Sequence, residues 1–201
     1  KLHSTEYAES SDPENGLTYS TIIDGQRLGS VITFSPQPIV HYVPELKGFL
    51  IRNGSGTIGD PYIGLDADKR YGGGIFIQDS YPIIEFNSFE NNGDGENERT
   101  WEGGAIFILS TTLEDNNGNI QLGNNVFRDN YASIGKILSS RGYTGMIDMT
   151  YSDVDVFHKD DGRDEVSVSK YWCYSDEAAF NFLYTTGEHA AIYAPTSITI
   201  N

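Results

Sequence analysis

The chain has 201 residues, a formal net charge of −16 at pH 7 and one cysteine. This length suffices for one domain with a substantial core, and a single cysteine excludes a scaffold held together by disulfides within the chain. The acidic balance argues against nucleic acid as a partner, because affinity for a phosphate backbone depends on clustered Lys and Arg. We also expect no transmembrane segment in this stretch, since no apolar run approaches the roughly 20 residues that a membrane-spanning helix needs.

Along the chain, a polar beginning is followed by many short apolar runs. Residues 1–17 are polar and predict a linker or an N-terminal cap. From residue 18 onward, short runs rich in Ile, Val and Phe alternate with Gly and Asn, which is typical of strands separated by turns. Near the end, Ser175 followed by residues 176–180 predicts one short helix. Residues 158–201 otherwise resemble the rest weakly, and we expect a degenerate final part of the domain or a cap.

Internal repetition is the strongest pattern in the sequence. Ile51, Phe89 and Phe127 follow one another at intervals of 38 residues, and three residues after each comes Gly54, Asn92 or Asn130. Ile75, Ile106 and Ile137 follow at intervals of 31 residues, preceded by the mostly small residues 72–74, 103–105 and 134–136. Alternation of two landmarks at constant spacing predicts a solenoid, in which equivalent side chains stack into internal ladders. Asn suits the stacked corners, because it tolerates left-handed backbone and hydrogen-bonds its own turn.

Two recurring tetrapeptides carry a resemblance to a known family. Residues 89–92 and 127–130 fit F-x-x-N, residues 103–106 read G-G-A-I, and residues 72–75 are a near copy of that motif. Together they resemble the repeat of the chlamydial polymorphic outer-membrane proteins, and more broadly the bacterial right-handed parallel β-helix surface proteins. The resemblance covers residues 20–137. It implies an all-β, right-handed parallel β-helix of about five to six short rungs over residues 18–201, secreted or at a bacterial cell surface and part of a longer chain.

Two long loops interrupt the repeat and concentrate acidic residues. Seventeen residues separate Gly54 from Gly72, and 10 separate Asn92 from Gly103. If both loops leave the solenoid at the same corner, their carboxylates lie on adjacent rungs and offer the oxygen ligands that Ca²⁺ prefers. The candidate calcium ligands are Asp60, Asp66, Asp68, Asp94, Glu96 and Glu98. The alternative is a pair of solvated acidic loops without metal.

The same loops contain the aromatic residues Tyr62, Tyr71 and Trp101. Exposed aromatic rings beside carboxylates form a surface on which a sugar ring can stack. The alternative is that each ring folds back over its own loop.

A further pair of carboxylates lies at Asp153 and Asp155, which alternation places on one face of a strand. Two neighbouring carboxylates are the acid and base of glycoside cleavage. The alternative is the polar outer face of a solenoid strand. The lone Cys173 is interpreted as a buried structural thiol.

These observations favour a non-catalytic, secreted or cell-surface module for adhesion or carbohydrate binding. Its partner is then an extracellular polysaccharide or a component of a host or cell surface. The alternatives are a polysaccharide lyase or glycoside hydrolase that uses Asp153 and Asp155, and a structural stalk. Enzyme activity is disfavoured because the paired Arg motifs of pectate lyases and the N-T-D and G-H-G blocks of polygalacturonases are missing.

Overall fold

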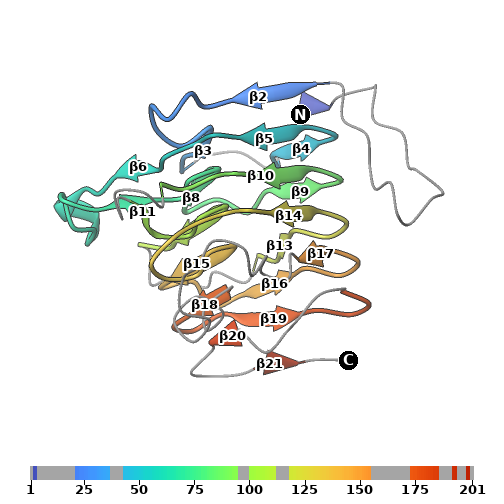
Figure 1. Ribbon diagram of the computed structural model, residues 1–201. Helices are drawn as coiled ribbons and strands as arrows, with labels where there is room; N and C mark the ends of the chain where they lie inside the picture. The colour runs from blue at the N-terminus through green and yellow to red at the C-terminus, as the bar shows by residue number, and fades with distance from the viewer. Residues whose placement is uncertain are drawn as a thin grey trace, which may run out of the picture.

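The computed structural model describes residues 2–3, 21–36, 43–94, 100–111, 118–154, 173–185, 192–193 and 198–199. Over these ranges the chain is an all-β parallel β-helix whose short strands stack along one axis, from β2 at the top of Figure 1 to β21 at the bottom. The five strands of one sheet belong to five successive rungs, so the predicted parallel β-helix of about five to six short rungs is confirmed. Within the described residues, no helix is long and apolar enough to cross a membrane.

Three parallel sheets form the walls of the solenoid. The seven-stranded sheet contains β1 (Leu2–His3), β4 (Glu45–Lys47), β9 (Ile83–Glu85), β13 (Ile120–Gln121), β16 (Met146–Asp148), β19 (Ala179–Asn181) and β21 (Ile198–Thr199). The five-stranded sheet contains β2 (Ile22–Asp24), β5 (Leu50–Arg52), β10 (Ser88–Glu90), β14 (Val126–Arg128) and β17 (Asp153–Val154). The six-stranded sheet contains β3 (Ile32–Phe34), β8 (Ile75–Gln78), β12 (Ile106–Leu109), β15 (Leu138–Arg141), β18 (Cys173–Ser175) and β20 (Ile192–Tyr193).

The core between the sheets consists of the predicted ladders. Ile51, Phe89 and Phe127 lie in register on β5, β10 and β14, and each is fully buried. The rings of Phe89 and Phe127 stack with centroids 5.0 Å apart and an interplanar angle of 11°. Because each ladder position repeats the same apolar contact, the 38-residue spacing in the sequence translates directly into burial.

The second predicted ladder is correct for two rungs and shifted by one residue in the third. Ile75 pairs with Ile106, but Ile106 pairs with Leu138 and not with Ile137. The shift arises because the glycines that start these strands, Gly103 and Gly135, occupy the same left-handed position, with φ of 67° and 58°. The prediction that residues 134–136 align with residues 103–105 is therefore wrong by one residue.

Asparagine ladders hold two corners of the solenoid. At the predicted corner, Asn92 Oδ1 accepts a hydrogen bond from the Gly54 amide (3.1 Å), and Asn92 Nδ2 donates to the Ile51 carbonyl (2.9 Å). Asn130 repeats this one rung further on, since its Oδ1 accepts from the Asn92 amide (3.2 Å) and its Nδ2 donates to the Phe89 carbonyl (2.8 Å). Each amide thus satisfies backbone groups of neighbouring rungs that the turn leaves unpaired.

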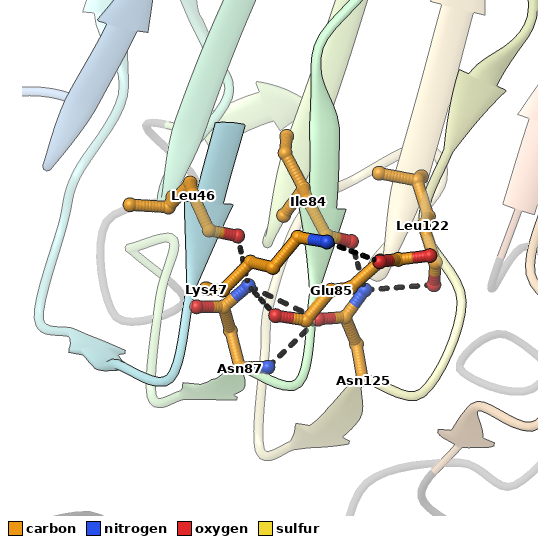
Figure 2. Close-up of polar contacts among 7 residues, drawn as sticks. All are labelled: Leu46, Lys47, Ile84, Glu85, Asn87, Leu122 and Asn125. Carbon is orange, nitrogen blue, oxygen red and sulfur yellow. Dashed lines mark hydrogen bonds and ion pairs between the residues drawn. The ribbon is translucent and has the colours of Figure 1, made fainter. Parts of the chain in front are cut away.

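A second ladder, which the sequence analysis missed, lies at another corner (Figure 2). Asn125 Oδ1 accepts from the amide and the Nδ2 of Asn87, at 2.9 and 3.2 Å. Asn125 Nδ2 donates to the carbonyls of Ile84 and Leu122, both at 2.7 Å. Figure 2 also shows the ion pair between Lys47 and Glu85 on the outer surface, at 2.8 Å. The missed signal was the recurrence of N-x-F in residues 87–89 and 125–127.

The short helix predicted after Ser175 does not form. Strand β19 begins at Ala179, and Phe180 continues the buried ladder below Ile147. Ser175 Oγ accepts a hydrogen bond from the Ala178 amide (2.6 Å), so this residue holds a turn between two strands. The apolar ladder outweighs local helix propensity, because a strand buries Phe180 completely.

Cys173 is buried, as predicted, with its Sγ 3.9 Å from Met149 Sδ. Of the predicted N-terminal segment, residues 1 and 4–17 lie outside the described residues. Strand β1 pairs with β4 at the start of the seven-stranded sheet.

Candidate functional site

The two long loops come together in a three-stranded sheet outside the solenoid. Strand β7 (Arg70–Tyr71) pairs in parallel with β11 (Thr100–Glu102) and antiparallel with β6 (Thr57–Ile58), and a single 3₁₀ turn, η1 (Pro61–Ile63), lies in the first loop. We call residues 57–71 and 100–102 the arm. In Figure 1, β6 and β11 project from the side of the stack. The prediction that the two loops lie side by side is confirmed by the pairing of β7 with β11.

A small second core fixes the arm to the solenoid. The outward side chains Phe76 and Phe107 of the six-stranded sheet are buried beneath Leu65 and Tyr71 of the arm. The Tyr71 and Phe107 rings lie 5.0 Å apart, and those of Phe76 and Phe107 lie 5.7 Å apart. Because apolar contacts pack the arm onto a sheet, the arm has a defined position on the solenoid.

The prediction of an exposed Tyr71 ring is therefore wrong. The side chain is 1% exposed, and its hydroxyl accepts a hydrogen bond from the Asp66 amide at 3.2 Å. Burial raises the pKa of the Tyr71 phenol above its ordinary value. Tyr71 folds back over its own loop, which was the alternative considered for this residue, and the stacking surface must lie elsewhere on the arm.

An ion pair with a buried carboxylate forms the base of the arm. The Glu102 carboxylate is fully buried and accepts hydrogen bonds from Arg141 Nε (2.8 Å), from a terminal nitrogen of Arg141 and from Ser139 Oγ (3.0 Å). Burial alone would lower the pKa of Arg141, but the hydrogen bonds and the charge of Glu102 outweigh this effect. The pKa of Arg141 is therefore raised above its ordinary value, and the guanidinium stays charged. This interaction links β11 of the arm to β15 of the solenoid.

The outer surface of the arm carries exposed aromatic and cationic groups. Tyr62 is 98% exposed at the tip, and the Lys69 ammonium lies 4.0 Å from the centre of the half-buried Trp101 ring. Lys69 also lines an open pocket of about 310 Å³, together with Ile58, Ala67, Asp68 and Arg70. We call this region the arm surface. The pocket is open and mostly polar, so the arm surface offers an exposed aromatic ring and hydrogen-bonding groups of both charges but no enclosed small-ligand site.

Of these residues, the sequence alone points to Tyr62 and Trp101 but not to Lys69, Arg70 or Ile58. Trp101 lies on β11 and the Lys69 ammonium reaches it from the loop before β7, so only the pairing of these strands brings the two together. No local motif carries that information.

Two of the predicted calcium ligands, Asp60 and Asp66, accept hydrogen bonds within turns of the arm. Asp60 Oδ1 accepts from the Tyr62 amide (2.9 Å) and caps η1, and Asp66 Oδ1 accepts from the Asp68 amide (3.0 Å). The Asp94 amide donates to Thr100 Oγ1 (2.9 Å). Among the described residues, no three potential metal ligands gather. Glu96 and Glu98 lie outside those residues, and calcium binding stays a prediction.

Asp153, the candidate catalytic residue, lies in register with Val126 on the outer face of the five-stranded sheet, beside a ladder of charges. Asp24, Arg52, Glu90 and Arg128 occupy equivalent positions on successive rungs, with alternating sign. Arg128 pairs with Asp153 at the end of this series. The arrangement matches the polar outer strand face that was the alternative for Asp153, and Asp155 lies outside the described residues.

Comparison with known proteins yields no relative. No protein-family model matches the chain, and neither a curated protein nor a solved structure matches it. The resemblance to chlamydial polymorphic outer-membrane proteins therefore stays a prediction from the motifs alone.

Proposed function

We propose that this chain is a non-catalytic module of a secreted or cell-surface protein, bacterial by the resemblance of its motifs. Its arm surface binds an extracellular polysaccharide or an equivalent glycan of a host or cell surface. The observation that carries the proposal is the Trp101 ring with the Lys69 ammonium 4.0 Å from its centre, since Lys69 also lines the pocket.

Glycan recognition suits this surface for a chemical reason. A sugar ring has apolar C–H faces that pack on an aromatic ring, and a rim of hydroxyls that need hydrogen-bond partners. Trp101 and Tyr62 supply aromatic rings for the C–H faces, while Asp68, Lys69 and Arg70 supply hydrogen-bond partners for the hydroxyls. The second core beneath the arm supports binding as well, because a rigid surface loses little conformational entropy when a ligand binds.

The enzymatic alternative has less support. Asp153 forms an ion pair with Arg128, and Asp60 and Asp66 accept hydrogen bonds from the backbone of their own turns. The hydrogen bonds and the ion pair of these carboxylates stabilise the fold, and this structural role does not require a substrate.

A glycan-binding assay tests the proposal. The protein is run through gels that contain neutral or acidic polysaccharides, with Ca²⁺ or with EDTA, and the recovered polysaccharide is sized by mass spectrometry. We expect retardation without shortening of the chains, and we expect Trp101→Ala to weaken binding at least about fivefold, which corresponds to about 1 kcal/mol. Leu28→Ala is the matched control, since Leu28 is 80% exposed on another part of the solenoid.

Two results contradict the proposal. Shortened chains would show catalysis, and the carboxylates would then be replaced one at a time. Equal retardation of wild type and Trp101→Ala would show that the glycan binds outside the arm surface.

A further inference from the structure

One corner of the solenoid carries bulky side chains where the backbone favours glycine. The turns after β13, β16 and β19 each contain a residue with positive φ: Asn124 (57°), Tyr151 (59°) and Tyr184 (53°). The Asn124 amide donates to the Thr150 carbonyl and the Tyr151 amide to the Leu183 carbonyl, both at 3.0 Å. The three turns therefore stack directly, and their central side chains form one column along the solenoid.

The positive φ at this turn position does not favour tyrosine. A left-handed backbone is unfavourable for residues with a Cβ atom, with Gly, Asn and Asp as the usual exceptions. The same corner uses Gly48 after β4 (φ 84°), the half-buried Phe86 after β9 (φ 57°) and Asn124 after β13. Two tyrosines on consecutive rungs thus carry a conformational cost that smaller residues avoid, and strain of this kind clusters at functional sites.

Burial does not compensate this cost. The Tyr151 and Tyr184 side chains are 58% and 67% exposed. Their rings lie 5.3 Å apart with an interplanar angle of 12°, so they form one aligned pair. Because the two rings stack on each other, the pair presents ring edges and two phenol groups to solvent, which suits a ligand that is partly apolar and partly polar.

A column of polar side chains runs beside the tyrosines. Gln121, Asp148 and Asn181 lie in register on the outer face of the seven-stranded sheet. Asp148 Oδ1 accepts from the amide of Thr150 at 3.0 Å, and Asn181 Oδ1 accepts from the amide of Leu183 at 3.2 Å. Among the described residues, no hydrogen bond engages Asp148 Oδ2 or Asn181 Nδ2. One acceptor and one donor are thus available on the two rungs that carry the tyrosines.

We infer that this corner, the tyrosine platform of Tyr151, Tyr184, Asp148 and Asn181, is a second binding site, and that its ligand is a neutral glycan chain aligned with the solenoid axis. Adjacent strands lie about 4.8 Å apart, close to the repeat of sugar rings in an extended chain, so successive rungs offer successive sugars equivalent contacts. The Asp148 carboxylate and the net charge of −16 disfavour a polyanion. The inference shares the ligand class of the proposed function but does not involve the arm.

Glycine substitutions test the platform with little risk to the fold. Tyr151→Gly with Tyr184→Gly removes both rings and relieves the left-handed strain, and Asp129→Gly (φ 51°) makes the same kind of change at another corner. Binding to soluble neutral glucan, mannan, xylan and galactan is measured by affinity electrophoresis for these variants, for Trp101→Ala and for the combined variant. Melting temperatures are recorded for all of them.

We expect the tyrosine double variant to weaken binding at least fivefold, in the wild type and in the Trp101→Ala background, while Asp129→Gly has no effect. Unchanged binding of the double variant would overturn the platform and leave the arm proposal intact. Loss of binding in the double variant but not in Trp101→Ala would support the platform and overturn the arm proposal. A large drop in melting temperature with unchanged binding would assign the tyrosines to stability and overturn the platform.

Discussion

Replacement of Asn125 by alanine tests whether the buried asparagine ladder stabilises the solenoid. The side chain is fully buried, and it makes the two accepted and two donated hydrogen bonds described above, all between 2.7 and 3.2 Å. A hydrogen bond of this kind contributes about 1 kcal/mol net, and more when its loss leaves a buried group unpaired. We therefore expect Asn125→Ala to lower the free energy of unfolding by about 4 kcal/mol.

The measurement is urea unfolding followed by far-UV circular dichroism, with the midpoint and slope compared between variants. Gln121→Ala is the control, because Gln121 is exposed on β13 in the same rung, and it should change stability by less than about 0.5 kcal/mol. Asn125→Asp keeps the shape but cannot donate as a carboxylate, so at pH 7 it should be at least as damaging as alanine. A loss below about 1.5 kcal/mol for Asn125→Ala would refute the view that the ladder satisfies otherwise unpaired backbone groups.

Three further changes probe the buried polar groups. Ser140→Ala should raise the unfolding free energy by about 1 kcal/mol in the same urea assay, because Ser140 Oγ is buried without a hydrogen-bond partner among the described residues. Arg141→Met should lower it by about 3 kcal/mol at pH 7, since the buried Glu102 carboxylate loses its partner; an unchanged midpoint would contradict the role of this ion pair. Burial raises the pKa of Cys173 to about 12, so the thiol should resist Ellman's reagent until the protein is unfolded. Above about pH 9 the unfolded chain ionises this thiol first, so stability should fall by up to about 1.4 kcal/mol per pH unit, a component absent in Cys173→Ala.

Much of the solenoid can be predicted from the sequence, because a parallel β-helix repeats in space what it repeats along the chain. The 38-residue interval places Phe89 over Phe127, and the asparagines three residues later meet at one corner. The ladder of Asn87 and Asn125 was equally accessible, since both precede a ladder phenylalanine by two residues. In each case the side chains that touch are separated by a constant number of residues.

Only the tertiary structure shows the strand registers and side-chain contacts that depend on loops of unequal length. One additional residue before β15 puts Leu138 where Ile137 was expected, and packing of the arm on Phe107 buries Tyr71. The partners of the candidate site residues are also long-range, since Lys69 meets Trp101 and Arg128 meets Asp153 only through strand pairing.

The tyrosine platform, too, can be recognised only in the tertiary structure and not in the sequence. Tyr151 and Tyr184 carry no motif, and only the stacking of their turns brings the two rings together. The spacing of the ladders therefore determined the solenoid, because inward contacts recur with each rung. The outer surfaces, where binding is proposed, follow from the lengths and folds of individual loops, which the repeat leaves free to vary.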